Sequence, residues 1–143
     1  MNGFPGRQRQ PVIACVGHAA LDHVFQVDTF PAHATKTPAR SYQATGGGMA
    51  ANAAVAAARL GARIRFVGAV GDDLAGRVVG EQLAQEGIDL THLQVVAGAA
   101  TSVSSVIVDR LGERHIFNHR GDALARAAVP HDRVFADCDA VLV

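Results

Sequence analysis

Three consecutive glycines, Gly46 to Gly48, stand directly before an alanine-rich stretch, MAANAAVAAARLGA. Because glycine has no side chain, a ligand can touch the backbone there, and the first amides of a helix point at such a ligand with the positive end of the helix dipole behind them. Asn52 follows one turn later, with an amide that both donates and accepts hydrogen bonds. These residues could bind a polar small molecule at the start of a helix.

Two other interpretations of the glycines stay open. They could form only a tight turn into a packed helix. The run GGGMAA also satisfies the dinucleotide fingerprint G-x-G-x-x-A, with Asp72 downstream, so an NAD-binding Rossmann oxidoreductase is an alternative. That fingerprint requires a buried first strand, however, and the preceding residues RSYQAT are polar. The sequence contains no phosphate loop of the type G-x-x-x-x-G-K-[ST].

The elements around the glycines alternate between buried strands and helices, which is typical of an open α/β sheet. Short apolar or β-branched runs predict strands at residues 12–17, 64–70, 93–96 and 139–143. Helices are predicted at residues 50–60 and 74–85, closed by Gly61 and Gly87, and Asp73 can cap the second. Patterns with a period near two predict strands with one solvent-exposed face at residues 23–27, 40–45, 102–109 and 114–118. The last two are expected to be joined by a turn at RLGE.

Composition limits the classes of partner. Hydrophobic residues make up 49% of the 143 residues and charged residues 18%, which suits one globular domain. Thirteen Lys and Arg residues balance thirteen Asp and Glu residues without a basic block, so we expect no nucleic-acid partner. No apolar run reaches about 18 residues and the start has no signal-peptide centre, so we expect no membrane attachment and a cytoplasmic protein.

Cysteine and histidine give no metal or redox motif. Cys15 and Cys138 lie in apolar runs, where a free cysteine usually behaves as a small core residue. His115 and His119 have the i, i+4 spacing of a helical metal site, but HIFNH is typical of a strand and lacks the glutamate of a zinc protease motif. We therefore expect no metal site.

Several stretches together resemble the N-terminal half of the PfkB, or ribokinase-like, carbohydrate kinases. ACVGHAALDHVFQVDTFP carries the G-x-x-x-x-D element, GGGMAANAAVAAARLGA carries GG-x-x-x-N and the LGA helix end, and VGAVGDDLAG carries G-x-G-D-D-x-x-G, all in the family's order. The resemblance implies a ribokinase-like open parallel sheet with helices on both faces and a small β-sheet lid. It places the core at about 12–17, 46–96 and 139–143, and the lid at about 20–45 and 102–119.

The resemblance also assigns roles to particular residues. Asp22 is similar to the carboxylate that grips sugar hydroxyls, Gly47 and Gly48 would let the sugar lie against the backbone, and Asn52 would add an amide contact. VDRLGERHIFN and GGGMAANAAVAAARLGA look most like the sulfofructose kinase branch, close to the ketohexokinases, in which Lys36 and Asn118 would hold an anionic end of the sugar. A turn-stabilising aspartate at 22 and a solvated surface lysine at 36 are the plainer alternatives.

The family's catalytic element is not in this sequence. PfkB kinases use a G-A-G-D element for the base and the phosphate-binding amides, and no G-A-G-D occurs here. Residues 1–10 are expected to be a disordered leader, and residues 11–143 the front part of a kinase whose C-terminal half is missing. The parent protein would use ATP and Mg²⁺ and would dimerise through the lid, whereas this chain alone would bind neither cofactor tightly and would be inactive. A non-catalytic sugar-binding fragment is the further alternative.

Overall fold

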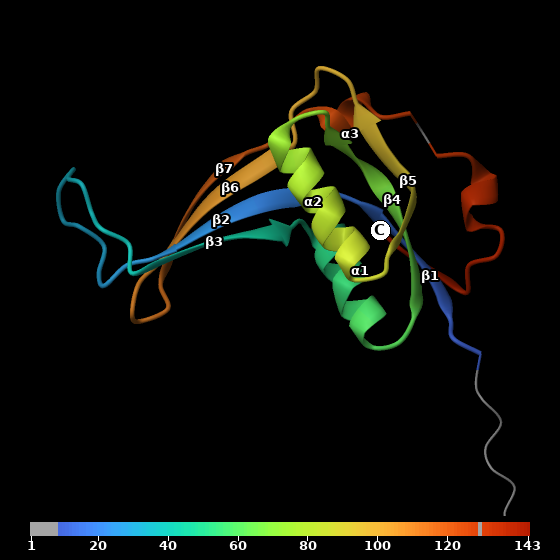
Figure 1. Cartoon of the computed structure of the whole chain (residues 1–143), viewed down its shortest axis with the longest axis horizontal. Coiled ribbons are helices and arrows are strands. Elements are labelled where there is room, and N and C mark those ends of the chain that lie inside the picture. The colour runs from blue at the N-terminus through green and yellow to red at the C-terminus, as the bar shows by residue number, and fades with distance from the viewer. Residues whose placement is uncertain (1–8, 129) are drawn as a thin grey trace, which may run out of the picture.

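Two separate sheets organise the computed structural model, which describes residues 9–128 and 130–143 (Figure 1). The expected leader, residues 1–10, lies outside the described residues except for its last two positions. The elements in chain order are β1 (Val12–Gly17), β2 (Ala20–Gln26), β3 (Ser41–Gly47), α1 (Met49–Arg59), β4 (Arg63–Gly71), α2 (Leu74–Gln85), β5 (Asp89–Val96), β6 (Ser102–Val108), β7 (Arg114–His119), α3 (Ala123–Arg126), the 3-10 helix η1 (Asp132–Phe135) and β8 (Ala140–Leu142).

The core sheet is parallel throughout and has the strand order β5-β4-β1-β8. Its central strands carry continuous apolar runs because both of their faces are covered. Cys15 of β1 and Phe66 of β4 have no exposed surface. Burial raises the pKa of the Cys15 thiol, so this cysteine is a core residue, as expected from its apolar neighbours.

Helices lie on both faces of the core sheet, as the sequence predicted. α1 and α2 cover one face (Figure 1), where Ala54 and Val79 are buried in one cluster with Phe66. The small alanine side chains let α1 approach the strands closely. On the other face, Ala123 of α3 packs against Ala69 of β4.

The second sheet, which we call the lid, has the order β3-β2-β6-β7. β2 pairs with β3 in antiparallel and with β6 in parallel orientation, and β6 and β7 form an antiparallel hairpin. The Asp109 carboxylate accepts hydrogen bonds from the amides of Leu111 (2.8 Å) and Glu113 (3.0 Å), which fixes the turn predicted at RLGE. The lid extends away from the core as a long arm (Figure 1).

Strands in both sheets depart from the predicted bounds, and β2 begins at Ala20 instead of residue 23. β5 begins at Asp89 instead of residue 93, because it lies at the sheet edge and its sequence DLTHLQVV alternates between half-buried and exposed positions. β3 continues to Gly47, so the first two glycines belong to the lid sheet, where Gly46 pairs with Leu21 and Gly47 with Ala20.

Gln82 of α2 joins the helix to the lid. Its side-chain oxygen accepts the amide hydrogen of Gly46, and its side-chain nitrogen donates to the carbonyl oxygen of Ala44 at 3.3 Å. The amide group thus satisfies one backbone donor and one backbone acceptor on the open edge of β3. α2 is held to β3 by polar contacts as well as by apolar packing.

Asp73 and Thr101 join the other end of α2 to the lid. Asp73 is the N-cap of α2, accepting from the Gly76 amide at 2.8 Å, as the sequence predicted. Its carboxylate also accepts from the amide and the hydroxyl of Thr101 (2.9 and 2.7 Å), whose Oγ1 accepts from the Gly71 amide. Burial opposes ionisation of Asp73, but the hydrogen bonds from Thr101 and Gly76 prevail and lower its pKa.

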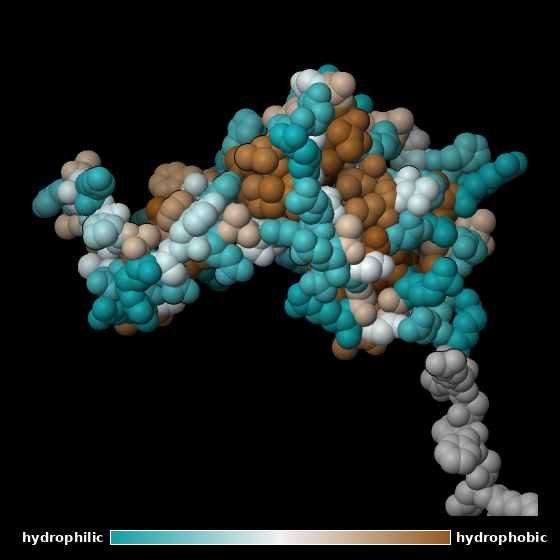
Figure 2. Space-filling model, in the orientation of Figure 1, coloured by the Kyte–Doolittle hydropathy of each residue, from teal (hydrophilic) through white to brown (hydrophobic). Residues whose placement is uncertain are grey.

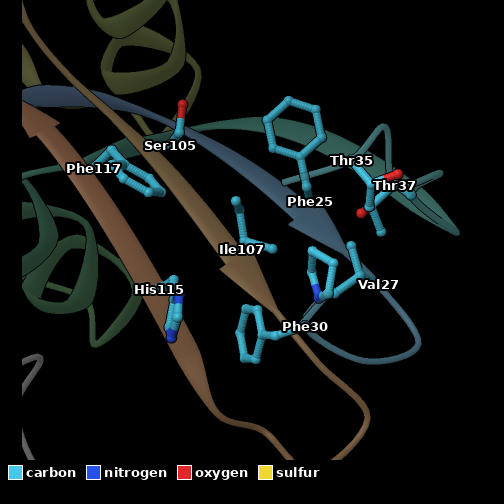
Figure 3. A pocket seen from close by; sticks show the side chains of 11 residues that line it. Phe25, Val27, Phe30, Thr35, Thr37, Ser105, Ile107, His115 and Phe117 are labelled. Carbon is cyan, nitrogen blue, oxygen red and sulfur yellow. The ribbon is translucent and has the colours of Figure 1, made fainter. Parts of the chain in front are cut away.

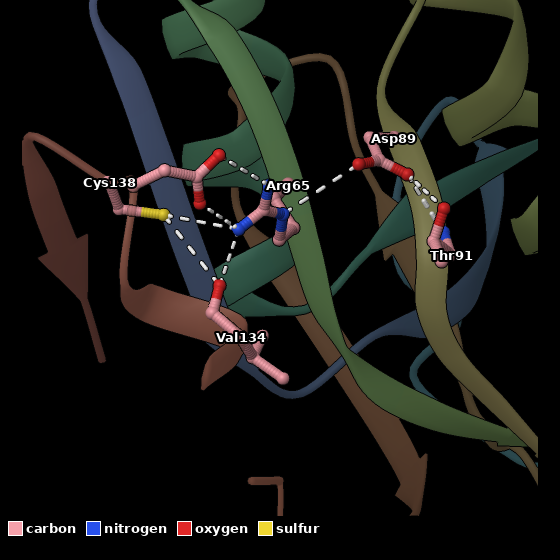
Figure 4. A network of polar contacts seen from close by, with 6 residues as sticks. Arg65, Asp89, Thr91, Val134 and Cys138 are labelled. Carbon is pink, nitrogen blue, oxygen red and sulfur yellow. Dashed lines mark hydrogen bonds and ion pairs between the residues drawn. The ribbon is translucent and has the colours of Figure 1, made fainter. Parts of the chain in front are cut away.

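Arg65 of β4 ties the segment before β8 to the core sheet (Figure 4). Its guanidinium donates to Asp137 at 2.8 Å and to the Val134 carbonyl oxygen, and lies 3.6 Å from Cys138 Sγ. The Arg65 side chain is only 17% exposed, and these bonds pair its terminal nitrogens, while its Nε lies 3.7 Å from Asp89 Oδ2 and has no hydrogen-bond partner among the described residues. The segment is thereby placed so that β8 can pair with β1.

The surface differs between the core and the end of the lid. Figure 2 shows hydrophobic surface over α2 and β5, where Leu74 and Val95 are 68% and 65% exposed. The loop of residues 31–40 at the end of the lid is exposed throughout. Among the described helices, none has the length and apolar character needed to cross a bilayer.

We predict that Gln82→Ala lowers the free energy of unfolding by about 1–3 kcal/mol, because two backbone groups lose their partner. Urea denaturation measures this loss, and hydrogen exchange should accelerate at the Gly46 amide. Gln85→Ala, on the exposed side of the same helix, is the matched control and should leave both unchanged. An unaltered exchange rate at Gly46 in Gln82→Ala would contradict the role of this side chain.

We predict that Asp73→Ala costs about 1–2 kcal/mol of stability at pH 7, the usual cost of losing an N-cap. Because the pKa of Asp73 is lowered on folding, its contribution is present above the ordinary value of 3.8 and is lost as the pH falls through the lowered value. Urea denaturation at pH 7 and pH 3 should therefore show a smaller difference between variant and unaltered protein at pH 3. Asp132→Ala, at an exposed position, serves as control.

Candidate functional site

The three glycines lie where the lid passes into the core. Gly48 is the N-cap of α1 and has a φ of 93°, a conformation that favours glycine. A Cβ at Gly48 would lie 2.5 Å from the His18 carbonyl oxygen, and a Cβ at Gly47 would lie 2.6 Å from Asp22 Cγ. The groups that come close to the glycine backbone are therefore the Asp22 carboxylate and the β1–β2 connection.

Asp22 belongs to a polar row across the lid. Residues directly opposite one another in a sheet share a face, and the register sets Thr45, Asp22, Ser104 and Asn118 side by side on β3, β2, β6 and β7. The Asn118 amide donates to Ser104 Oγ at 3.2 Å. Two residues singled out by the sequence, Asp22 and Asn118, thus lie on one face with Ser104 between them.

Asn52 lies close to the Thr45 end of this row. It is exposed on α1 and lines a groove of about 370 Å³ between α1 and α2, together with Thr45 and Gly46. At the far end of the groove, Arg59 Nε donates to Glu86 at 2.9 Å. The free Asn52 amide and the Asp22 carboxylate both carry hydrogen-bonding capacity for hydroxyl groups at the glycine turn.

Lys36 is not brought to this cluster within one chain. It is exposed in the loop at the end of the lid, and its neighbours Thr35 and Thr37 line a cavity of about 580 Å³ (Figure 3). The other walls of the cavity are mainly apolar and include Phe25, Phe30, Ile107, His115 and Phe117. Because side chains alternate along a strand, Phe117 and Phe25 face away from the side that carries Asn118 and Asp22.

The two faces of the lid differ: the face opposite Asp22 is mainly apolar, and the face of Asp22 is mixed. Val24, Val106 and Ile116 continue the face of Asp22 toward the end of the lid. The opposite face holds the aromatic cavity, in which Phe30 stacks on His115 with ring centroids 4.1 Å apart. His115 and His119 are exposed lid residues, and the described part of the chain contains no group of three or more His, Cys, Asp or Glu side chains placed to hold a metal ion.

The dinucleotide interpretation does not fit this arrangement. Gly46 and Gly47 end β3, an antiparallel lid strand whose first three residues are exposed, and the turn at Gly48 does not follow the first buried strand of the core. Asp72, the downstream acid of the fingerprint, accepts the Gly98 amide at 3.0 Å and so holds the loop between β5 and β6.

A bare phosphate group does not fit the residues at the glycine turn either. The Asp22 carboxylate stands directly against Gly47, and its negative charge would repel a phosphate placed on these amides. A carboxylate accepts hydroxyl hydrogen bonds, so the donor set suits a neutral polyol. The chemistry available to the described residues here is the binding and orientation of hydroxyl groups.

Two members of the polar row, Thr45 and Ser104, were not identified from the sequence. Both lie in strands with alternating patterns, so the sequence predicts that they belong to strands. Their place beside Asp22 depends on the pairing register of three strands, which a single sequence does not specify.

Comparison with known proteins agrees with the arrangement of lid, glycine turn and core. Residues 10–142 match the pattern of the pfkB family carbohydrate kinases. Ribokinase from Haemophilus influenzae is 36% identical over 104 residues, which are 73% of this chain and 34% of that protein, so the chain spans about a third of this relative.

Solved structures share the fold. A candidate ribokinase from Agrobacterium tumefaciens has a TM-score of 0.87 and 34% identity, over 93% of this chain and 44% of that one. Ribokinase from Cryptococcus neoformans in complex with ADP has a TM-score of 0.66 and 25% identity, over 93% and 40% of the respective chains. The chain therefore belongs to the pfkB family of carbohydrate kinases.

Proposed function

We propose that this chain is the acceptor-binding portion of an ATP-dependent kinase that phosphorylates a primary hydroxyl of a sugar. The observation that carries the proposal is the Asp22 carboxylate set against Gly47 at the glycine turn, within the polar row that ends at Asn118. The ADP complex of the Cryptococcus neoformans ribokinase supports a nucleotide donor. A kinase that draws on cellular ATP would work in the cytoplasm.

In this proposal the residues of the chain bind and orient the sugar. Asp22 accepts hydrogen bonds from two hydroxyls, and the glycine turn lets the ring approach the backbone. Asn52 and Asn118 add amide contacts at either side. Held in this way, the acceptor hydroxyl would present its oxygen in one direction, which is a large part of phosphoryl-transfer catalysis.

The donor side of the reaction is proposed to come from elsewhere in the parent protein. ATP with Mg²⁺ would supply the phosphoryl group and neutralise its charge, and a G-A-G-D element would supply the base and the anion-binding amides. The described residues include no group of side chains placed to hold a metal ion, and the sequence has no G-A-G-D element. We therefore propose that the isolated chain is inactive and binds no nucleotide tightly.

For the substrate, we propose a ketohexose or sulfofructose type of sugar. Asn118 is in the polar row, whereas Lys36 is at the end of the lid, so one chain does not bring both to a single anionic group. A homodimer through the lids would provide the lysine from the second copy. Exposed Tyr42, Ile116 and Phe117, each more than half exposed, provide apolar surface for such a contact.

We expect Asp22→Asn to weaken the binding of D-fructose or D-ribose by this chain about tenfold or more, because hydrogen bonds to a charged acceptor contribute about 1.5–3 kcal/mol. Isothermal titration calorimetry measures the affinity. Asp28→Asn is the matched control, since Asp28 is at the other end of β2 and pairs with Arg110 at 2.8 Å. Equal affinities in Asp22→Asn and the unaltered protein would contradict the proposed site.

We expect no sugar-dependent release of ADP from ATP by the isolated chain. A coupled assay for ADP, with D-fructose and D-ribose in turn and with Mg²⁺ present, measures it. ADP release above the sugar-free background would show that the chain has a donor site of its own. It would overturn the proposal that the donor site lies elsewhere in the parent protein.

A further inference from the structure

The cavity of about 580 Å³ on the lid, which we call the lid cavity, is not used by the candidate sugar site (Figure 3). It lies on the face of the lid opposite Asp22, between strands β2, β6 and β7 and the loop that follows β2. Its volume is within the range of about 300–1,000 Å³ that is typical of small-molecule sites. The lid cavity is therefore a candidate for a second binding site.

The pairing register builds the floor and two walls of the lid cavity. Ile107 of β6 lies between Phe25 of β2 and His115 of β7, and Ser105 lies opposite Phe117. Because β2 and β7 are separated by one strand, their facing side chains stand about 10 Å apart. A ring in van der Waals contact with both walls needs about 3.5–4 Å on each side. The gap between Phe25 and Phe117 thus admits one flat ring and excludes a thicker saturated one.

The loop after β2 closes the lid cavity at the end of the lid. Phe30 from this loop stacks on His115, with the two rings 17° from parallel. The start of the loop is anchored, because the Asp28 carboxylate pairs with Arg110 at 2.8 Å. This wall is held in place by the chain itself, and the stack shows that aromatic rings already meet face to face on this side of the cavity.

The lining of the lid cavity carries hydroxyl groups but no acidic side chain. Among the described residues that line it, none is Asp, Glu, Lys or Arg. An ion placed there would lose hydration without gaining a countercharge, so the lining favours a neutral ligand. Ser105, Thr35 and Thr37 supply hydroxyl groups, which both donate and accept hydrogen bonds. A ring with polar atoms at its edge uses these hydroxyls, whereas a hydrocarbon chain does not.

We infer that the lid cavity binds a neutral, planar heteroaromatic molecule of one or two fused rings. Its faces pack against Phe25 and Phe117, and a nitrogen atom at its edge exchanges a hydrogen bond with Ser105 Oγ. The site is distinct from the candidate sugar site, because β2 and β6 direct Asp22 and Ser104 to the opposite face of the lid. The inference therefore does not rest on the proposed function.

The first experiment observes the floor of the lid cavity. Benzimidazole is the probe, since it is a neutral bicyclic ring with one donor and one acceptor nitrogen. Carbon-13 methyl NMR of isoleucine is recorded on the unaltered chain with increasing benzimidazole. The Ile107 methyl resonances are expected to shift and saturate, because a stacked ring lies over them, and those of Ile116, on the opposite face, should stay constant. Absence of a saturable shift at Ile107 would overturn the inference.

The second experiment measures the affinity for benzimidazole by calorimetry. Phe117→Leu keeps an apolar side chain but removes the ring, and Phe117 is 67% exposed, so the variant should fold. It should weaken binding about threefold to tenfold. His119→Leu is the matched control, because it removes an exposed ring on the same face of β7 outside the lid cavity. Ser105→Ala should weaken binding about twofold to tenfold. An affinity unchanged in Phe117→Leu would contradict the stacking.

The third experiment distinguishes the ligand from a second copy of the chain. Sedimentation velocity gives the mass of the unaltered chain with and without benzimidazole, and the mass is expected to stay the same while the Ile107 resonances shift. A dimer that binds no benzimidazole and dissociates in Phe117→Leu would assign the lid cavity to the second copy, and would overturn the inference.

Discussion

The contact on which the structure depends is the approach of the β1–β2 connection to the glycine turn. The lid strand β3 passes into the core helix α1 through Gly48 alone, with a positive φ and no loop. The His18 carbonyl and the Asp22 carboxylate fill the space that side chains at Gly48 and Gly47 would need. A larger residue at Gly48 would meet the backbone of His18 and Ala19 in a strained conformation, and one at Gly47 would displace the Asp22 carboxylate.

Helix α2 also holds the lid to the core, through hydrogen bonds near both of its ends. Its amino-terminal end holds Thr101, the entry to lid strand β6, through Asp73, and Gln82 near its carboxyl end holds lid strand β3. The lid is thus attached at two places, at the start of β6 by the partly buried carboxylate of Asp73 and at the edge strand β3 by the amide of Gln82. The hydrogen bonds of Asp73 and Gln82 therefore both orient the lid and stabilise α2.

Much of the fold followed from local sequence patterns. The bounds of α2, its Asp73 cap and the buried core strands depend on neighbouring residues, and these were predicted. β3 was predicted too short because Gly46 and Gly47 disfavour strands, yet pairing with β2 overrides that tendency. Likewise the row that joins Asp22 to Ser104 and Asn118 depends on long-range register, which one sequence leaves undetermined.

Alternation along the lid strands explains why one sheet can serve two purposes. Each strand directs successive side chains to opposite faces, so β2 places Asp22 on one face and Phe25 on the other. Near the core, the first face meets the glycine turn, and the second packs on α2. Beyond α2 the second face continues as the aromatic cavity, so the part of the lid proposed to bind a sugar and the part proposed to meet a second copy are separated along the strands. Lys36, at the far end, belongs to the second part.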